Sequence, residues 1–200
     1  NKWEEINYEH TPSKAHQIYK TAFKRHTPEK YTTYLQSLVK GTAKVNAGAV
    51  FPYEIVRQWN VLQLMEAQWK AQPDYVPEGV SFLPIIDCSG SMGWMGNKQG
   101  PVKPLEVAIS LGLYLSERNK SIFKDMFVTF SENPQFQYVR GNLRARMYQM
   151  STSKWDMNTN IQAVFDKLLT LAVKNKVHQE DMPTHMIIVS DMQFDHCCRN

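Results

Sequence analysis

The sequence predicts an α/β fold, in which a doubly wound parallel β-sheet follows a helical N-terminal region. Two observations support this fold class. Apolar residues in the first 79 positions recur at helical spacing, whereas from residue 80 short apolar runs typical of buried strands alternate with longer helical patterns. Such alternation is characteristic of a sheet covered by helices on both faces.

Three helices are expected in the N-terminal region. Thr11-Pro12 and Thr27-Pro28 each combine an N-cap residue with a proline suited to the first helical turn, and Gly41 is a typical C-terminal stop. A third helix should begin near Pro52. The apolar positions expected to share a face are Ala15, Ile18, Tyr19, Ala22 and Phe23, then Tyr31, Tyr34, Leu35, Leu38 and Val39, then Ile55, Val56, Trp59, Leu62 and Trp69. Such helices could form a solenoid tail or a packing flank, and the sequence leaves both open.

A proline-bearing linker at residues 72–79 divides the chain into a helical region, 1–79, and an α/β domain, 80–200. The apolar run at residues 80–86 is short, β-branched near its end and terminated by Asp87, as expected of a buried parallel strand. Pro84 is unusual in such a strand, because proline lacks the N–H that a sheet ladder uses.

The rest of the domain alternates between helices and strands. Helices are expected at residues 104–118, 143–150 and 159–173, and strands at 122–130, 136–139 and 186–189. In doubly wound sheets the ligand site lies beyond the carboxyl ends of the parallel strands. Polar residues that follow those strands are therefore the candidates for function.

Small oxygen-bearing side chains occupy three loops at this expected edge. The first loop holds Asp87, Ser89 and Ser91, the second Thr159, and the third Ser190 and Asp191. A turn that presents residues i, i+2 and i+4 can direct a carboxylate and two hydroxyls into one space, helped here by a glycine. Hard oxygen donors suit Mg²⁺ or Mn²⁺ better than Zn²⁺, which prefers sulfur and imidazole.

The order Asp87-x-Ser89-x-Ser91 after an apolar strand, then Thr159, then Asp191 after the next buried strand resembles the metal-ion-dependent adhesion site of von Willebrand factor A domains. The resemblance implies a Rossmann-like sheet, Ser89, Ser91 and Thr159 as direct ligands, and Asp87 and Asp191 as supporting carboxylates. It also implies that an acidic group of a partner completes the metal shell. A complete domain of this kind has about six strands, so the rest of the sheet is expected from a longer chain or a partner.

A looser resemblance covers most of the chain. Residues 13–57, with Phe51-Pro52-Tyr53-Glu54-Ile55-Val56 among them, and the loop at residues 155–160 are similar to Ro-like proteins, and within these to a group found in plants and large DNA viruses. In Ro-like proteins a helical RNA-binding region leads into a von Willebrand factor A domain. The resemblance implies RNA as an alternative ligand.

One basic segment is a candidate contact surface. The chain carries 23 Lys and Arg against 19 Asp and Glu, a net charge of +4. Arg140, Arg144, Arg146 and Lys154 lie in a stretch without acidic residues and by themselves match that excess. They could contact RNA or a protein partner, or form a solvated helix face. Trp94, close to the metal loop, could be an exposed contact or a buried anchor.

The chain is expected to be intracellular and cytoplasmic. Three cysteines, two of them adjacent, favour a reducing compartment. No apolar run approaches the roughly 18 to 20 residues that span a bilayer, so membrane insertion is not expected. The Ro-like resemblance is compatible with a viral source.

The leading hypothesis is a divalent-cation-dependent module that binds a protein or RNA partner, and not an enzyme. Ser89 lacks the G-x-S-x-G elbow of a nucleophile, and Gly90, Gly93 and Gly96 lack dinucleotide-binding spacing. Two alternatives stay open. One is a Ro-like RNA-binding protein that uses its basic and helical surfaces, and the other is a structural component of a larger assembly in which the metal staples the fold.

Overall fold

The computed structural model describes residues 2–58, 61–93, 95, 100–130, 134–152 and 161–192. The chain divides into two compact units, Asn1–Asp74 and Tyr75–Asn200. In the described part of the chain, no helix combines the length and the apolar character needed to cross a membrane.

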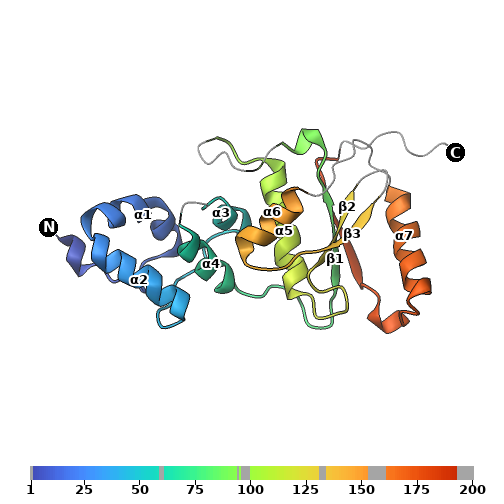
Figure 1. Cartoon of the computed structure of the whole chain (residues 1–200), viewed down its shortest axis with the longest axis horizontal. Helices are drawn as coiled ribbons and strands as arrows, with labels where there is room; N and C mark the ends of the chain where they lie inside the picture. Colours follow the sequence, from blue (N-terminus) through green and yellow to red (C-terminus); the bar gives the residue numbers. More distant parts are fainter. Residues whose placement is uncertain are drawn as a thin grey trace. The chain divides into compact units, whose positions relative to one another are not determined.

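The first unit is helical (Figure 1). A short 3-10 helix, Lys2–Glu5, precedes α1 (Ser13–His26), α2 (Pro28–Lys40), α3 (Pro52–Val56) and α4 (Leu62–Lys70). The predicted end of the second helix is confirmed, because Gly41 caps α2 with a left-handed φ of 73°.

The single helix predicted from Pro52 is wrong, because α3 ends at Val56 and α4 begins only at Leu62. Gln58 accounts for the break. Its backbone N–H donates to the Ile55 carbonyl three residues back, and its side-chain amide donates to the Glu54 carbonyl at 3.3 Å. The carbonyl that would accept the next helical hydrogen bond is therefore bonded to a side chain instead.

The predicted apolar face of α1 is also partly wrong. Ile18 and Tyr19 are 64% and 52% exposed, whereas His16 and Phe23 are buried. The buried side of α1 faces Tyr8, whose ring lies 5.1 Å from that of Phe23 and whose carbonyl accepts a hydrogen bond from His16. Apolar periodicity missed this face because a histidine lies at its centre.

His16 is the buried titratable group of this aromatic core. Its ring stacks on Tyr34 with centroids 5.4 Å apart, and its Nε2 donates to the Tyr8 carbonyl at 2.7 Å. Because a carbonyl only accepts, Nε2 carries the proton and Nδ1 is the unprotonated nitrogen. Nδ1 is buried and has no hydrogen-bond partner among the described residues, so a second proton would be placed where nothing accepts it.

We expect the helical unit to lose stability as the pH falls below about 6.5. Burial lowers the pKa of His16 from its usual 6.5, and the hydrogen bond to Tyr8 only partly opposes that shift. The unfolded chain therefore takes up a proton before the folded unit does. The stabilisation is complete above the unfolded pKa and is lost as the pH falls through the lower folded pKa. Urea denaturation followed by far-UV circular dichroism at neutral and mildly acidic pH measures this loss.

The matched comparison for this prediction uses two histidines. His16→Phe should flatten the pH dependence, because the titrating group is gone while an aromatic ring still fills the site. His10→Phe should leave it as in the parent protein, because His10 is exposed. Equal slopes in the parent and in His16→Phe would show that His16 is not the source.

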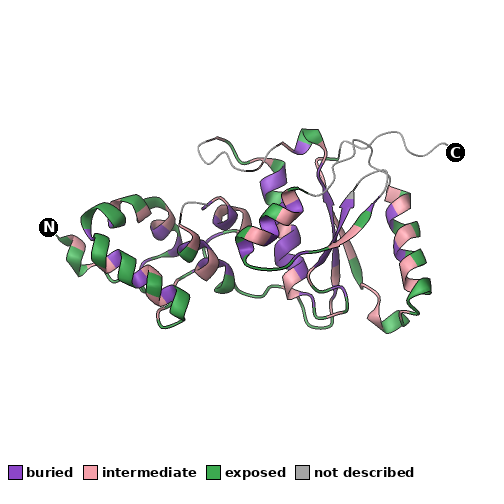
Figure 2. Cartoon of the chain, viewed as in Figure 1, coloured by how far each residue is buried: buried purple, intermediate pink, exposed green. Residues whose placement is uncertain are grey.

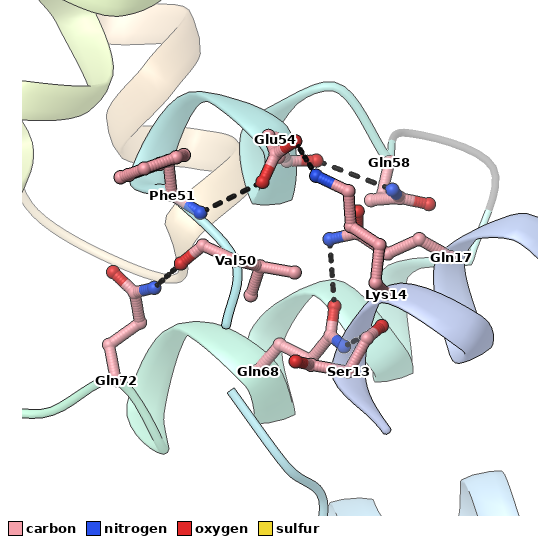
Figure 3. Close-up of polar contacts among 9 residues, drawn as sticks. All are labelled: Ser13, Lys14, Gln17, Val50, Phe51, Glu54, Gln58, Gln68 and Gln72. Atoms are coloured by element: carbon pink, nitrogen blue, oxygen red, sulfur yellow. Dashed lines mark hydrogen bonds and ion pairs between the residues drawn. The ribbon is translucent and has the colours of Figure 1, made fainter. Parts of the chain in front are cut away.

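Buried amides tie the helices of this unit together (Figure 3). The Gln68 side chain, fully buried in α4, donates to the Ser13 carbonyl at the start of α1 at 3.2 Å and accepts from Gln17 at 3.3 Å. Gln72 donates to the Val50 carbonyl at 2.6 Å. Each of these bonds joins a side chain of one segment to the backbone of another, so they hold α4 and the residues after it against the start of α1 and the loop before α3.

The second unit is built on a four-stranded sheet, with β1 (Phe82–Asp87), β2 (Met126–Phe130), β3 (Gln135–Tyr138) and β4 (His185–Val189) in the order β3-β2-β1-β4. β1 is parallel to β2 and β4, and β3 is antiparallel to β2. The predicted α/β class is thus confirmed, and the sheet is mostly but not entirely parallel, because β3 runs antiparallel to β2.

Helices lie on both sides of this sheet (Figure 1). α5 (Pro104–Arg118) and α6 (Leu143–Ser151) lie on one side, and α7 (Ile161–Lys174) lies on the other. Two 3-10 turns, Gly90–Met92 and Gln179–Asp181, follow β1 and α7. β1, β2 and α5 carry most of the buried positions, whereas α7 is exposed along much of its length (Figure 2).

Two details of the strands differ from or qualify the sequence prediction. β2 begins at Met126 and not at Ile122, because residues 122–125 form a turn that closes with Asp125 at a φ of 59°. Pro84 is accommodated in β1 because it lies opposite Ile187 of β4, whereas pairing with β2 begins only at Ile85. A proline at this position therefore interrupts pairing on one side at most.

Candidate functional site

Asp87 lies at the carboxyl end of β1 and is completely buried. One carboxylate oxygen, Oδ1, accepts the backbone N–H of Ser89 at 2.8 Å, and the other, Oδ2, accepts the Ser190 hydroxyl at 2.5 Å. Ser190 directly follows β4, and the register that pairs Ile86 with Val189 brings it beside Asp87. The carboxylate is thus held from two neighbouring strand ends.

The loop after Asp87 turns back over the strand end. Met92 anchors it, with 1% of its surface exposed, and the 3-10 turn Gly90–Met92 bends the backbone. This bend brings the Ser89 and Ser91 hydroxyl oxygens to 3.0 Å from each other. Ser89 is half-buried and Ser91 is exposed, so the group is closed towards the core and open towards solvent.

The spacing of the two hydroxyls fits an octahedral cation. Mg²⁺ binds oxygens at about 2.0 to 2.1 Å, so two adjacent ligands of an octahedron lie about 3.0 Å apart. The 3.0 Å between the Ser89 and Ser91 oxygens equals this edge, although it also suits a hydrogen bond. Both oxygens could therefore bind one ion without a large movement of the loop.

The charge of Asp87 also favours a cation. Its carboxylate is removed from water, yet its contacts with the described residues are hydrogen bonds and not ion pairs. A buried carboxylate without a counter-charge is costly, and a bound cation would offset that cost. No group of three or more His, Cys, Asp or Glu side chains gathers among the described residues. The donors here are mainly hydroxyls, which is typical of a weak site for a hard cation.

Cys88 lies inside this loop, but it is not one of the candidate metal ligands. It is a buried free thiol, and burial, reinforced by the nearby charge of Asp87, raises its pKa to about 12. A thiol that stays protonated at neutral pH is a poor nucleophile, and Mg²⁺ prefers oxygen ligands to sulfur. Cys88 therefore acts as a small core residue.

The remaining candidate metal ligands follow other elements. Asp191 directly follows Ser190 and is half-exposed. Thr159 lies outside the described residues, two positions before α7 begins. The structure thus brings together Asp87, Ser89 and Ser91, and places Asp191 next in the chain to a residue that bonds Asp87.

The predicted basic contact surface is wrong at one residue, Arg146. Arg140 and Arg144 are exposed, as expected of a contact surface. Arg146 is buried instead, and its Nη1 lies 3.0 Å from Glu117 Oε2 in an ion pair between α6 and α5. Its position on α6 turns it towards α5, so it is a packing residue. Lys154 and Trp94 lie outside the described residues.

Ser190 was expected in the third loop, but its hydrogen bond to Asp87 was not predicted. Its position in the dipeptide Ser190-Asp191 at a strand end was the available signal, since the carboxyl ends of parallel strands share one edge. Its contact with Asp87 depends on the register of β4 against β1, which periodicity does not determine.

Comparison with known proteins assigns each part of the chain to a domain of unknown function. Residues 1–78 match DUF2828, and residues 81–200 match DUF7788. The chain is also 31% identical to an uncharacterized protein of Acanthamoeba polyphaga mimivirus, over 98% of this chain and 37% of the viral protein. It therefore spans little more than a third of the length of that relative. Since the DUF7788 match covers more than half of the residues, the chain belongs to the DUF7788 family.

Proposed function

We propose that the chain is a divalent-cation-dependent binding module, with a Mg²⁺ or Mn²⁺ site beyond the carboxyl ends of β1 and β4. One observation carries the proposal. The carboxylate of Asp87 and the hydroxyls of Ser89 and Ser91 gather at this edge, at a spacing that suits an octahedral ion. The similarity to the metal-ion-dependent adhesion site of von Willebrand factor A domains supports the same conclusion, as does the mostly parallel sheet.

Each residue has a role in this proposal. Ser89 and Ser91 would bind the ion directly, together with Thr159. Asp87, held by Ser190, and Asp191 would act as supporting carboxylates that neutralise the charge and orient bound water. The ion would supply an electrophilic centre for one oxygen ligand from outside the chain.

The function is binding and not catalysis. Direct ligands that are mostly uncharged leave the ion attractive to an incoming carboxylate or phosphate. Ser91 is exposed, so such a group from a protein or RNA partner can approach the open side. The thiol of Cys88 in the loop is a poor nucleophile, because burial raises its pKa to about 12.

The test is titration of Mg²⁺ and Mn²⁺ into the folded protein by calorimetry, with Ser91→Ala as the variant. We expect the parent protein to bind one ion and Ser91→Ala to bind it at least about 10-fold more weakly. Ser37→Ala is the matched control, because Ser37 is a half-exposed helix residue far from the loop in sequence, and its hydroxyl donates to the Thr33 carbonyl. Absence of binding to folded parent protein, or equal affinity in Ser91→Ala, would rule out the site.

RNA binding through α6 is a second candidate function. Arg140 and Arg144 are exposed, and Tyr148, one helical turn after Arg144, is 64% exposed. Exposed arginines with an aromatic ring nearby can bind phosphates and stack on bases. Such binding should weaken steeply with salt and persist in EDTA.

A metal ion that only stabilises the fold predicts a third result. EDTA would then lower the melting temperature of the protein without changing its binding to any partner.

A further inference from the structure

A cavity of about 410 Å³ lies between the C-terminal half of α7 and β3. α7 packs against β2, and β3 is the strand beyond β2 in the described sheet, so the helix leaves part of β3 uncovered (Figure 1). Phe136 and Tyr138 of β3 pair with Val128 and Met126 of β2, and opposed residues of neighbouring strands lie on one face of a sheet. Val128 and Met126 belong to the core that α7 covers, so Phe136 and Tyr138 face the helix across the cavity.

The cavity has a closed floor and an open mouth. Its floor consists of Phe123, Met126 and Leu168, which are at most 9% exposed. Ile122 and Tyr138, which are 51% and 53% exposed, lie at its mouth. Pockets that bind small molecules measure about 300 to 1,000 Å³, so this cavity has the size of a small-molecule site.

The walls of the cavity are unfavourable for water. The lining is apolar apart from Tyr138 and Asn175. Backbone groups of the helix end are already paired, because Val177 N–H donates to the Ala172 carbonyl at 2.9 Å and Asn175 N–H donates to the Leu171 carbonyl at 3.0 Å. A water molecule held in a cavity needs about two to four polar partners. A ligand that displaces water from these walls therefore gains the free energy of burying apolar surface.

Asn175 gives the cavity a directional polar group. Its Nδ2 donates to the Leu171 carbonyl at 2.8 Å, which holds the side chain and leaves Oδ1 as an acceptor. Oδ1 accepts no hydrogen bond from the described residues. None of the described side chains that line the cavity is charged, and the exposed Lys124 and Lys176 do not line it. An ionised ligand would lose its hydration there without gaining a counter-charge.

We propose that this cavity binds a small, neutral aromatic molecule that carries one N–H or O–H donor. The rings of the ligand lie against Phe123, Phe136 and Tyr138, whose own rings favour aromatic contacts. A body of about two or three rings suits the volume. The donor of the ligand bonds Oδ1 of Asn175 near the mouth.

The cavity is separate from the proposed metal site. Met126, at the start of β2, lines the cavity, whereas Asp87 pairs with Phe130 at the end of β2. The strand between residues 126 and 130 spans about 13 Å. Binding in the cavity should therefore not require a divalent cation, and the two sites can be tested independently.

Fluorescence titration of the full chain with N-phenyl-1-naphthylamine, in EDTA, tests the proposal. This probe is neutral, aromatic and carries one N–H, and its emission rises in apolar surroundings. The matched control is 8-anilino-1-naphthalenesulfonate, which has the same rings with a sulfonate beside the N–H. We expect one site for the neutral probe and at least about 10-fold weaker binding of the sulfonate, which would be buried against the Asn175 oxygen without a counter-charge.

Three variants locate the bound probe. Ala172→Phe puts a ring into the space of the ligand and should weaken binding of the neutral probe at least about 10-fold. Thr170→Phe is its matched control, because Thr170 is exposed on the same helix and does not line the cavity, and it should keep the affinity of the parent. Asn175→Ala removes the acceptor and should weaken binding about 5-fold. The fold should tolerate this change, since Asn175 is exposed.

Other results overturn the proposal. Absence of probe binding to the folded parent protein would mean that the cavity is not a ligand site. Equal affinity in the parent and Ala172→Phe would place the probe on another surface, and equal affinity for the two probes would contradict a preference for neutral ligands. If circular dichroism shows Ala172→Phe to be unfolded, Asn175→Ala decides, because unchanged affinity there would rule out the proposed hydrogen bond and a loss would support it.

Discussion

Replacing Gly112 with valine is expected to lower the free energy of unfolding by about 3 kcal/mol, because the interior has no room for the added methyl groups. Gly112 lies in α5 where the helix crosses β1. A Cβ atom there would lie 2.7 Å from Ile86 Cδ1 and 3.1 Å from Met150 Cε. Ile86 is fully buried in β1 and Met150 in α6, so neither side chain can swing into solvent. Denaturation in guanidinium chloride measures the loss.

A smaller substitution at position 112 tests the contact with Ile86 specifically. Gly112→Ala gains up to about 1 kcal/mol of helix propensity but still meets Ile86, so a smaller net loss is expected. Ile86→Val removes the Cδ1 atom that the new Cβ would meet, and the double variant should recover part of that loss. Gly48→Ala is the control, because a Cβ there meets nothing within 4 Å. A Gly112→Val protein as stable as the parent would contradict this packing.

Local chemistry in the sequence was enough to predict several elements. Thr27-Pro28 and Gly41 mark the ends of α2 because N-cap, proline and left-handed glycine preferences are properties of single residues. The apolar run before Asp87 is a buried strand for a comparable reason, since a short continuous apolar run suits a strand covered on both faces.

Elements decided by contacts between distant residues could not be predicted in this way. α3 and α4 share one apolar pattern in the sequence. The helix stops between them because the Gln58 side chain donates to the Glu54 carbonyl, which the next helical hydrogen bond would need. The pattern in α7 includes Phe165 and Leu169 with the core residues, yet the sheet buries Val164 and Leu168 only. Periodicity finds apolar positions without showing which of two adjacent stripes meets the sheet.

The candidate site shows the same division. Asp87, Ser89 and Ser91 were identifiable because the strand, the turn and the donors follow each other within a few residues. Ser190 is about as close to Asp87 as a hydrogen bond allows, but it lies 103 positions away in the sequence. Only the register between β1 and β4 brings the two together. The residues on both strand ends were therefore visible in the sequence, whereas the hydrogen bond between Ser190 and Asp87 was not.

Replacing Asp87 with asparagine is expected to weaken Mg²⁺ or Mn²⁺ binding by about 100-fold, because it removes the buried negative charge that balances the ion. The fold should be almost unaffected in EDTA. An amide oxygen can still accept the Ser89 N–H, and the amide nitrogen can donate to the Ser190 hydroxyl. Loss of affinity without loss of structure separates a metal role of Asp87 from a purely structural one.

Thermal denaturation with and without the metal measures both the metal affinity and the stability of the metal-free fold. At a free-ion concentration 100 times the dissociation constant, binding stabilises the parent protein by about 2.7 kcal/mol, and a 100-fold weaker variant at that concentration retains only about 0.4 kcal/mol. Asp166→Asn is the control, because Asp166 is an exposed carboxylate on α7 and its loss should leave the full metal effect. If Asp87→Asn also kept the full effect, the ion would bind elsewhere. If it lost stability equally in EDTA, the buried carboxylate would serve the fold alone, through its bonds to Ser89 and Ser190.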